Sequence, residues 1–410
     1  METPDVKYID KDFDFDEYDG PFVIIPGTDF RYYPFGDIYQ DLTEVKEFNR
    51  LHSIKQLGTV GSSLIHACQD QDRSYHSYVA AIMIDIILTR NNFSKKERQL
   101  GIASALYHDI SILPYSDQGK LLKPGKYEEE SLLEYFINNS PEIQERLKKY
   151  NIKVKSLVET IQGKGIIGKL LNSKEGIDAD NLSYLAIDQF CTCTAPPFED
   201  MDYLKQKRIF EQYKNIRFSD GEWVFEDLNG LLDLLKFRAL MYSRIYMNPF
   251  NRAKEAFLIR RLKGENIPLD EVIRWGDYQF DNWFRNKFGE HEFGLFFYIS
   301  KTPFREIARE YDLKKLEQLR KEKEKDNVIV EYLKAPRNAL KNLVVYKNEV
   351  RLLNEIPEYA ERVKKIEDII KKLNYIGVFE KATAEQNFDF RCSDTDLLDI
   401  AEGNIPQISR

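Results

Sequence analysis

The strongest constraint on the fold is an apolar helical repeat in the segment SYHSYVAAIMIDIILTR, residues 74–90. Its apolar side chains recur every three or four residues: Tyr75, Val79, Ile82, Met83, Ile86 and Ile87. This spacing places them along one face of an α-helix. A stripe this apolar has to be covered by other elements. We therefore expect a buried helix over residues 74–90, with His76 beside its apolar stripe.

Similar patterns predict that most of the chain is helical. In residues 42–58, Val45, Phe48, Leu51, Ile54 and Leu57 follow one another at three-residue steps, which predicts a helix that ends at Gly58. Ser94 and Glu97 form the spacing of a capping box, which predicts a helix start before residues 95–110. Further helices are expected at 129–139, 155–162, 178–190, 229–247 and 250–263, and a short strand in GPFVIIPG, residues 20–27.

The pattern changes in the last quarter of the chain. The charge run LKKLEQLRKEKEKDN indicates a solvated helix face near residue 314. Beyond it, NVIVEYL, NLVVYKNEVRLL and YIGVFE are typical of strands, and residues 356–373 of a helix. We therefore expect a mainly α fold, with a helical bundle in residues 1–325, its motifs within about 40–265, and a small α/β appendage in 326–385. Residues 386–410 form a tail.

Composition excludes several classes of protein. Of the 410 residues, 42% are hydrophobic and 31% charged, which is ordinary for a globular chain. The net charge of −8 gives no global positive field for nucleic acid, so we do not expect it as a partner. No apolar run approaches the roughly 18 residues of a membrane span. Four cysteines are too few for a disulfide scaffold, which favours a cytoplasmic location.

Candidate metal ligands come from a short set, because the chain has five histidines: His52, His66, His76, His108 and His291. His108 precedes Asp109 in ALYHDISILPYSD, residues 105–117. Such a dipeptide alone is compatible with a satisfied core histidine. Together with His76 and a later aspartate, however, the pair could supply two imidazoles and two carboxylates, a set that divalent ions accept.

Several motifs occur in the order and approximate spacing of one family. They are FNRLHSIKQLG (48–58), DRSYHSYVAA (72–81), ALYHDISILPYSD (105–117), GIDADNLSYLAIDQ (176–189) and FRALMYSRIYMNPFNRAKEA (237–256). The chain resembles the HD-domain phosphohydrolases, in particular the deoxynucleoside triphosphate triphosphohydrolases (dNTPases), over about residues 20–265. The C-terminal α/β segment also resembles that of bacterial and archaeal members.

The resemblance implies a divalent ion, one of Mn, Mg, Fe, Co, Ni or Zn, bound by His76, His108, Asp109 and Asp180. Asp178 is the neighbouring alternative for the last ligand. It also implies conversion of a dNTP to a deoxynucleoside and triphosphate, and assembly into homo-oligomers.

A substrate pocket follows from the same resemblance. Asp180, Tyr184 and Asp188 are four residues apart, so a helix presents them on one face. The resemblance implies that Tyr184 packs near the deoxyribose and that Asp188 and Gln56 contact its 3′-hydroxyl. It places Arg238 and Tyr246 against phosphate and sugar. Arg73 is a second candidate phosphate clamp, because a guanidinium can bind phosphate bidentately.

The chain departs from the family pattern at positions that handle protons and triphosphate. Where the family has histidines or lysines, this sequence has Ile112, Asp117, Tyr127, Asn181, Asn248 and Pro249. Asp117 and Tyr127 are therefore the candidate catalytic replacements. The loss of imidazoles and cations leaves two alternatives open. One is a nucleotidase or phosphatase that acts on less charged nucleotides, and the other is a catalytically impaired, nucleotide-binding regulator.

Overall fold

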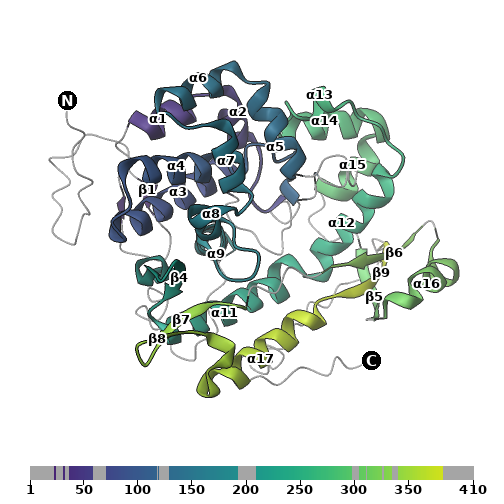
Figure 1. Ribbon diagram of the computed structural model, residues 1–410. Coiled ribbons are helices and arrows are strands. Elements are labelled where there is room, and N and C mark those ends of the chain that lie inside the picture. The colour runs from purple at the N-terminus through teal and green to yellow at the C-terminus, as the bar shows by residue number, and fades with distance from the viewer. Residues whose placement is uncertain are drawn as a thin grey trace.

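The mainly α architecture expected from the sequence is confirmed (Figure 1). The computed structural model describes residues 23–24, 31–32, 37–58, 71–117, 119, 129–192, 209–297, 304–310, 312–325, 327–334 and 340–381. Tyr127 and the tail after residue 385 lie outside these ranges. Among the described residues, no helix combines the length and the apolar character that crossing a membrane requires.

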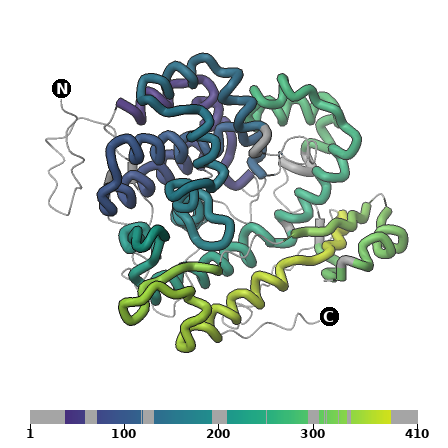
Figure 2. The backbone as a smooth tube through the Cα atoms, viewed as in Figure 1, coloured from purple at the N-terminus to yellow at the C-terminus, as the bar shows by residue number. Residues whose placement is uncertain are grey.

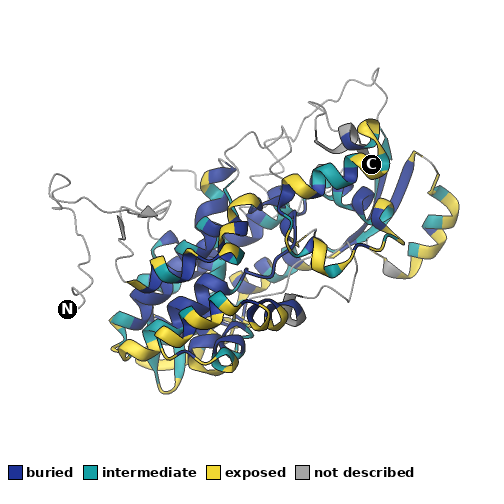
Figure 3. Ribbon diagram, turned by 90° about the horizontal axis from the view of Figure 1, so that it is seen from above, coloured by how far each residue is buried: buried dark blue, intermediate teal, exposed yellow. Residues whose placement is uncertain are grey.

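The first part of the chain is a helical bundle. Its helices are α1 (Asp37–Thr43), α2 (Lys46–Asn49), α3 (Arg73–Arg90), α4 (Lys95–Tyr107), α5 (Glu129–Asn138), α6 (Pro141–Lys149), α7 (Val154–Ile161), α8 (Gly165–Leu171), α9 (Ala179–Cys191), α11 (Leu228–Met241), α12 (Pro249–Leu262), α13 (Leu269–Val272), α14 (Asp277–Phe288) and α15 (Glu290–Phe297). Buried residues gather where these helices face one another, and exposed residues lie on the outer faces (Figure 3).

Helix α3 forms the centre of this bundle, as its apolar repeat predicts. Residues 79–88 are all buried, and α3 packs against α4 and α9. Gly101 permits the close approach of α4, because a Cβ atom there would lie 2.6 Å from Leu88 Cδ1 and 2.8 Å from Ile84 Cγ2. The buried helix predicted over residues 74–90 is therefore confirmed to within one residue.

The capping box at the start of α4 is also confirmed. The Ser94 N–H donates to Glu97 Oε2 at 2.9 Å, and the Glu97 N–H donates to Ser94 Oγ at 3.4 Å. These bonds satisfy amide groups that have no partner within the helix.

We expect Ser94→Ala to lower the free energy of unfolding by about 1 kcal/mol, because it removes the hydroxyl that caps the exposed Glu97 amide. Urea denaturation followed by far-ultraviolet circular dichroism measures this change, with Ser94→Thr as the control that retains a capping oxygen. A Ser94→Ala midpoint equal to that of the wild type would show that the cap contributes nothing.

The single helix predicted over residues 42–58 is wrong. The five apolar residues that predicted it are buried, but the segment divides into α1, α2 and a 3₁₀ turn at Arg50–Ser53. The reason is a non-local pairing. The Gln56 N–H donates to the Gln71 carbonyl at 2.7 Å, and the Arg73 N–H donates to the Ile54 carbonyl at 2.9 Å. Because these backbone groups form hydrogen bonds with residues at the start of α3, they cannot form the bonds that would continue the helix.

The C-terminal residues form two small sheets. One has the order β3-β4-β7-β8, from β3 (Ile216–Ser219), β4 (Glu222–Phe225), β7 (Leu343–Tyr346) and β8 (Glu349–Leu352). The other, here called the C-terminal sheet, has the order β5-β9-β6, from β5 (Phe304–Glu310), β9 (Tyr375–Lys381) and β6 (Val328–Leu333). Helix α16 (Leu316–Lys323) packs beside β6, and α17 (Pro357–Lys372) lies between β8 and β9 in sequence.

Both sheets attach the C-terminal residues to the helical bundle. Strand β7 runs parallel to β4, and α17 packs along α11, so this segment follows one side of the bundle (Figure 2). The C-terminal sheet packs against α12. Strand β5 precedes the boundary expected at residue 325, yet it pairs with β9. The sheet is therefore built from both sides of that boundary.

Candidate metal centre

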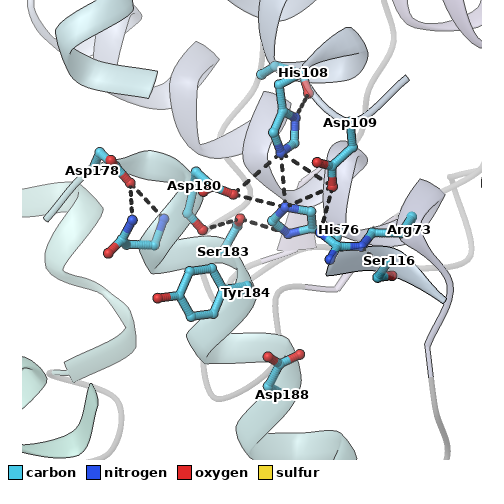
Figure 4. A network of polar contacts seen from close by, with 12 residues as sticks. Arg73, His76, His108, Asp109, Ser116, Asp178, Asp180, Ser183, Tyr184 and Asp188 are labelled. Carbon is cyan, nitrogen blue, oxygen red and sulfur yellow. Dashed lines mark hydrogen bonds and ion pairs between the residues drawn. The ribbon is translucent and has the colours of Figure 1, made fainter. Parts of the chain in front are cut away.

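Three helices bring the expected metal ligands together (Figure 4). His76 lies in the first turn of α3, which Asp72 caps by accepting the Tyr75 N–H. His108 and Asp109 follow the last turn of α4. Asp180 lies in the first turn of α9. Residues far apart in sequence thus meet because α3 packs against both α4 and α9.

The distances within this group suit a small cation. The two imidazole Nε2 atoms of His76 and His108 are 3.0 Å apart. Asp180 Oδ1 lies 3.0 Å from the first and 3.4 Å from the second. Asp109 Oδ2 lies 3.6 Å from each. His76, His108 and Asp180 satisfy the spacing of a metal site, and Asp109 borders it. We call these four residues the metal cluster.

Hydrogen bonds on the far side of each imidazole determine which nitrogen carries a proton. His108 Nδ1 lies 2.7 Å from the Ala105 carbonyl, which can only accept, so this nitrogen is protonated. The Ser183 hydroxyl donates to the Asp180 carbonyl at 2.8 Å and therefore accepts from His76 Nδ1 at 3.1 Å. In the neutral rings, both Nε2 lone pairs then point at each other, which is unfavourable unless a cation or a proton lies between them. The residues present therefore fit a divalent ion.

The charges in the metal cluster also favour a cation. Burial alone would lower the pKa of His108, but the Asp109 and Asp180 carboxylates outweigh it and raise that pKa to about 10. Burial would raise the pKa of Asp109, yet the Arg73 guanidinium and the imidazoles hold it at about 2. In the metal-free protein, a proton on His108 therefore supplies the positive charge that the carboxylates attract.

Metal affinity is consequently expected to rise with pH. At neutral pH the incoming ion must displace the His108 proton, so the apparent affinity should increase by up to about tenfold per pH unit until the pH reaches the His108 pKa of about 10. The metal-free protein should lose stability as the pH rises from 6.5, the ordinary pKa of a histidine, to about 10, because the raised pKa stabilises the folded state only while the ring is protonated. Calorimetric titration with Mn²⁺ in buffers of different ionisation enthalpy should detect release of about one proton. A pH-independent affinity would contradict this assignment.

Asp178, the alternative to Asp180 as the last metal ligand, has a structural role at the start of α9. Its carboxylate accepts from the Ser173 N–H at 2.6 Å and from the Asn181 N–H at 2.8 Å, which makes it the cap of α9. Burial and the nearby Asp180 charge raise its pKa to about 8. The Asn181 side-chain amide donates to the same carboxylate at 2.6 Å. Asp180 is thus the aspartate of this pair that lies among the imidazoles.

Two cavities meet at the metal cluster. The first encloses about 360 Å³, and its walls include Gln162, Asn172, Lys174 and Arg238. The second encloses about 380 Å³, and its walls include Gln56, Asp188, Tyr246, Arg252, Glu255 and Lys334. Asp109, Asp117, Asp180, Tyr184 and Tyr242 line both. We call the cavity of about 360 Å³ the first lobe, and the cavity of about 380 Å³ the second lobe, of one cleft.

The residues expected near a sugar line the second lobe. The Tyr246 hydroxyl donates to Asp188 Oδ2 at 2.5 Å, and the Tyr184 and Tyr242 hydroxyls lie 3.3 Å apart. Gln56 is buried, and its Oε1 atom has no hydrogen-bond partner among the described residues. A buried acceptor of this kind suits a ligand hydroxyl.

The two arginines expected to clamp phosphate differ in their surroundings. Arg238 is buried in the wall of the first lobe, with its guanidinium 4.8 Å from the centre of the Tyr242 ring. Arg73 donates from Nη1 to Asp109 Oδ2 at 2.8 Å and from Nε to Ser116 Oγ at 3.0 Å. Arg73 therefore orients a member of the metal cluster, whereas Arg238 faces the space where a substrate would lie.

The two candidate catalytic residues are placed unequally. The Asp117 side chain is 71% exposed, lines both lobes and lies 3.9 Å from Arg73 Nη2. Tyr127 is outside the described residues. Ile112, at a family histidine position, is buried and lines the second lobe.

Sequence reasoning missed part of the cleft. The helix predicted over residues 229–247 is present as α11, which continues directly into a single π-helical turn at Tyr242–Tyr246, and this change of geometry was not predicted. Such turns are frequent at functional sites. Tyr242 has the same four-residue spacing from Arg238 and Tyr246, which could have indicated a site residue. Nothing in the local sequence pointed to Lys174, Arg252, Glu255 or Lys334.

Known proteins add information about the fold. No model of a known protein family matches the chain. An uncharacterized protein of Bacillus subtilis, YwfO, is 26% identical over 231 residues, which cover 54% of this chain and 51% of that protein. The chain thus spans about half the length of this curated relative.

Two solved structures resemble the chain over most of their length. A hypothetical protein from Aquifex aeolicus has a TM-score of 0.66 at 19% identity, covering 86% of this chain and 93% of its own. A phosphohydrolase from Bacteroides thetaiotaomicron has a TM-score of 0.61 at 17% identity, covering 88% of this chain and 100% of its own. The chain therefore shares the fold of these two structures.

Proposed function

We propose that this protein is a metal-dependent phosphohydrolase that acts on a nucleotide, with a dNTP as the first candidate substrate. The observation that carries the proposal is the metal cluster, in which two imidazole Nε2 atoms and two carboxylates meet at the junction of two cavities. The similarity of the fold to that of a phosphohydrolase supports it. The HD-type motifs that contain these ligands connect the proposal to the dNTPase branch.

His76, His108, Asp109 and Asp180 would hold the divalent ion. When bound, such an ion acts as a Lewis acid toward a phosphoryl oxygen and lowers the pKa of water at the site. The chain's own residues orient the reaction. Arg73 holds Asp109 through the bond at 2.8 Å, and Ser183 holds His76 through the bond at 3.1 Å.

The two lobes suit the two ends of a nucleotide. In the first lobe, Arg238 and Lys174 provide positive charge for phosphoryl oxygens. In the second lobe, Gln56 and Asp188 provide acceptors for sugar hydroxyls. Because both lobes border the metal cluster, a nucleotide with its phosphates in the first lobe and its nucleoside in the second would place a phosphorus atom beside the metal.

A nucleotidase that acts on less charged nucleotides is the second candidate. Apart from the metal ligands, the first lobe is lined by the Asp117 carboxylate and by two cationic side chains, those of Lys174 and Arg238, while the raised pKa of Asp178 favours its neutral form at pH 7. A triphosphate would bring about four further negative charges into this lobe. A monophosphate would meet less repulsion, so this balance of charge favours it over a triphosphate.

The test is product analysis with dNTPs, NTPs and dNMPs in the presence of Mn²⁺, Mg²⁺ or Co²⁺. Tripolyphosphate and deoxynucleoside released from a dNTP would establish the dNTPase reaction. Orthophosphate released from monophosphates would establish the nucleotidase instead. Bound metal without turnover of any of these nucleotides would overturn the proposal and leave a nucleotide-binding regulator.

Ser183→Ala is expected to weaken metal binding about 10- to 100-fold, because Ser183 fixes the His76 proton on Nδ1. Titration of the metal-free protein with Mn²⁺ measures the affinity directly. Ser77→Ala, which removes a buried hydroxyl of α3 next to His76 in sequence, is the matched control. An unchanged affinity in Ser183→Ala would show that Ser183 does not orient His76.

A further inference from the structure

The second lobe extends beyond the sugar-facing residues to a group of charged side chains. Arg252 and Glu255 lie one turn apart on α12 and form an ion pair, with side chains that are only 15% and 14% exposed. Lys334 follows strand β6 and lines the same lobe. None of the three belongs to the metal cluster.

The positions of these three residues relative to one another are fixed, because α12 is hydrogen-bonded to and packs against the C-terminal sheet. Arg260, two turns after Arg252, donates from Nη1 to the carbonyls of Lys325 and Val328 at 3.1 and 3.2 Å. Helix α12 packs against all three strands of that sheet (Figure 1). The sheet therefore supplies one wall of the cleft and is more than an appendage.

Some buried polar atoms in the second lobe have no hydrogen-bond partner among the described residues. Arg252 Nε is buried and has no hydrogen-bond partner among the described residues, as is also true of Gln56 Oε1 in the same lobe. Burial raises the pKa of Glu255, and the Arg252 charge offsets this rise only in part. Buried polar atoms without partners are costly, and a ligand with complementary atoms would satisfy them.

We propose that Arg252, Glu255 and Lys334 read the edge of the nucleobase and favour keto bases over amino bases. This inference rests on the proposed function, because it requires that the ligand is a nucleotide. Two cationic donors and one carboxylate acceptor complement an edge with carbonyl or ring-nitrogen acceptors and an imino N–H. Guanine offers O6, N7 and N1–H, and thymine and uracil offer O4, O2 and N3–H.

Adenine and cytosine match this arrangement less well. They carry an amino donor where keto bases carry a carbonyl, and a bare ring nitrogen where keto bases carry the imino N–H. In the pose that pairs a keto base with these residues, the amino group would face the cations, and the ring nitrogen would face the Glu255 carboxylate. Apolar and aromatic walls from Leu57, Ile112, Tyr246 and Met247 suit the faces of any base, so they do not discriminate.

The experiment compares kcat/KM for the guanine, thymine, adenine and cytosine nucleotides with the same sugar and the same number of phosphates. We expect the wild type to favour guanine and thymine about tenfold. Glu255→Gln should remove most of this preference, because an amide can both donate and accept. Lys334→Met should reduce it. Lys365→Met, an exposed lysine of α17 outside the cleft, should leave it unchanged.

Binding of nucleosides separates this inference from the proposed function. Calorimetry with deoxyguanosine, thymidine, deoxyadenosine and deoxycytidine needs no turnover. The same keto preference, lost in Glu255→Gln, would support the base subsite even if no nucleotide were hydrolysed. Equal affinity and equal kcat/KM for all four bases would overturn it. So would a Glu255→Gln variant that lowers every rate by the same factor and keeps the ranking, because that is the behaviour of a structural ion pair.

Discussion

Replacing His108 and Asp109 together by alanine is expected to lower kcat/KM for nucleotide hydrolysis by about 10³-fold or more. The double variant removes one imidazole and one carboxylate from the metal cluster, and it also removes the acceptor of Arg73 at 2.8 Å. The remaining His76 and Asp180 form too small a ligand set for a divalent ion. Phosphate or tripolyphosphate release under saturating Mn²⁺ measures the loss.

His291→Ala is the control, because it removes an exposed imidazole of α15 that does not line the cleft. Loss of Asp109 leaves the buried Arg73 guanidinium without its charge partner, which could unfold the protein. His108→Gln with Asp109→Asn preserves the approximate shapes and serves as the second variant. Activity within threefold of the wild type in a folded double variant would exclude His108 and Asp109 from the reaction.

Replacing Arg238 by alanine is expected to lower kcat/KM by about 10²- to 10³-fold. Arg238 is the buried cation of the first lobe, where charge on phosphoryl oxygens increases during the reaction. Arg238→Lys should recover only part of the activity, because an ammonium cannot reproduce the planar, bidentate contact or the stacking on Tyr242. Steady-state kinetics on the best substrate measures both variants.

Lys236→Ala, on the same helix but paired with Asp233 outside the cleft, is the matched control. A purely structural role of Arg238, through its contact with Tyr242, would lower the melting temperature of the variant and leave kcat/KM near that of the wild type. Such a result would exclude Arg238 from phosphate recognition.

Local sequence patterns predicted the elements that depend mainly on interactions between residues close together in the sequence. The apolar repeat of residues 74–90 predicted α3, and the Ser94 to Glu97 spacing predicted the start of α4. The metal cluster could be anticipated because its members lie within motifs whose order is typical of one family. The structure brings His76, His108, Asp109 and Asp180 within a few ångströms of one another.

Non-local contacts explain what the sequence could not predict. The helix predicted over residues 42–58 breaks because residues 54–56 pair with residues 71–73, a contact that no periodicity encodes. Arg73 lines the second lobe, as a phosphate ligand would, but its bond to Asp109 depends on the packing of α3 against the end of α4 and was not predicted. Lys334 enters the cleft because the C-terminal sheet packs on α12.

The most direct test of the account is the metal content of the purified protein, measured by elemental analysis and by titration after removal of metal with a chelator. The account predicts tight binding of a divalent ion at the metal cluster of the wild-type chain, and loss of that binding in the His108→Ala and Asp109→Ala double variant. A folded wild-type protein that contains no divalent ion and takes up none of Mn²⁺, Mg²⁺, Fe²⁺, Co²⁺, Ni²⁺ or Zn²⁺ would contradict it.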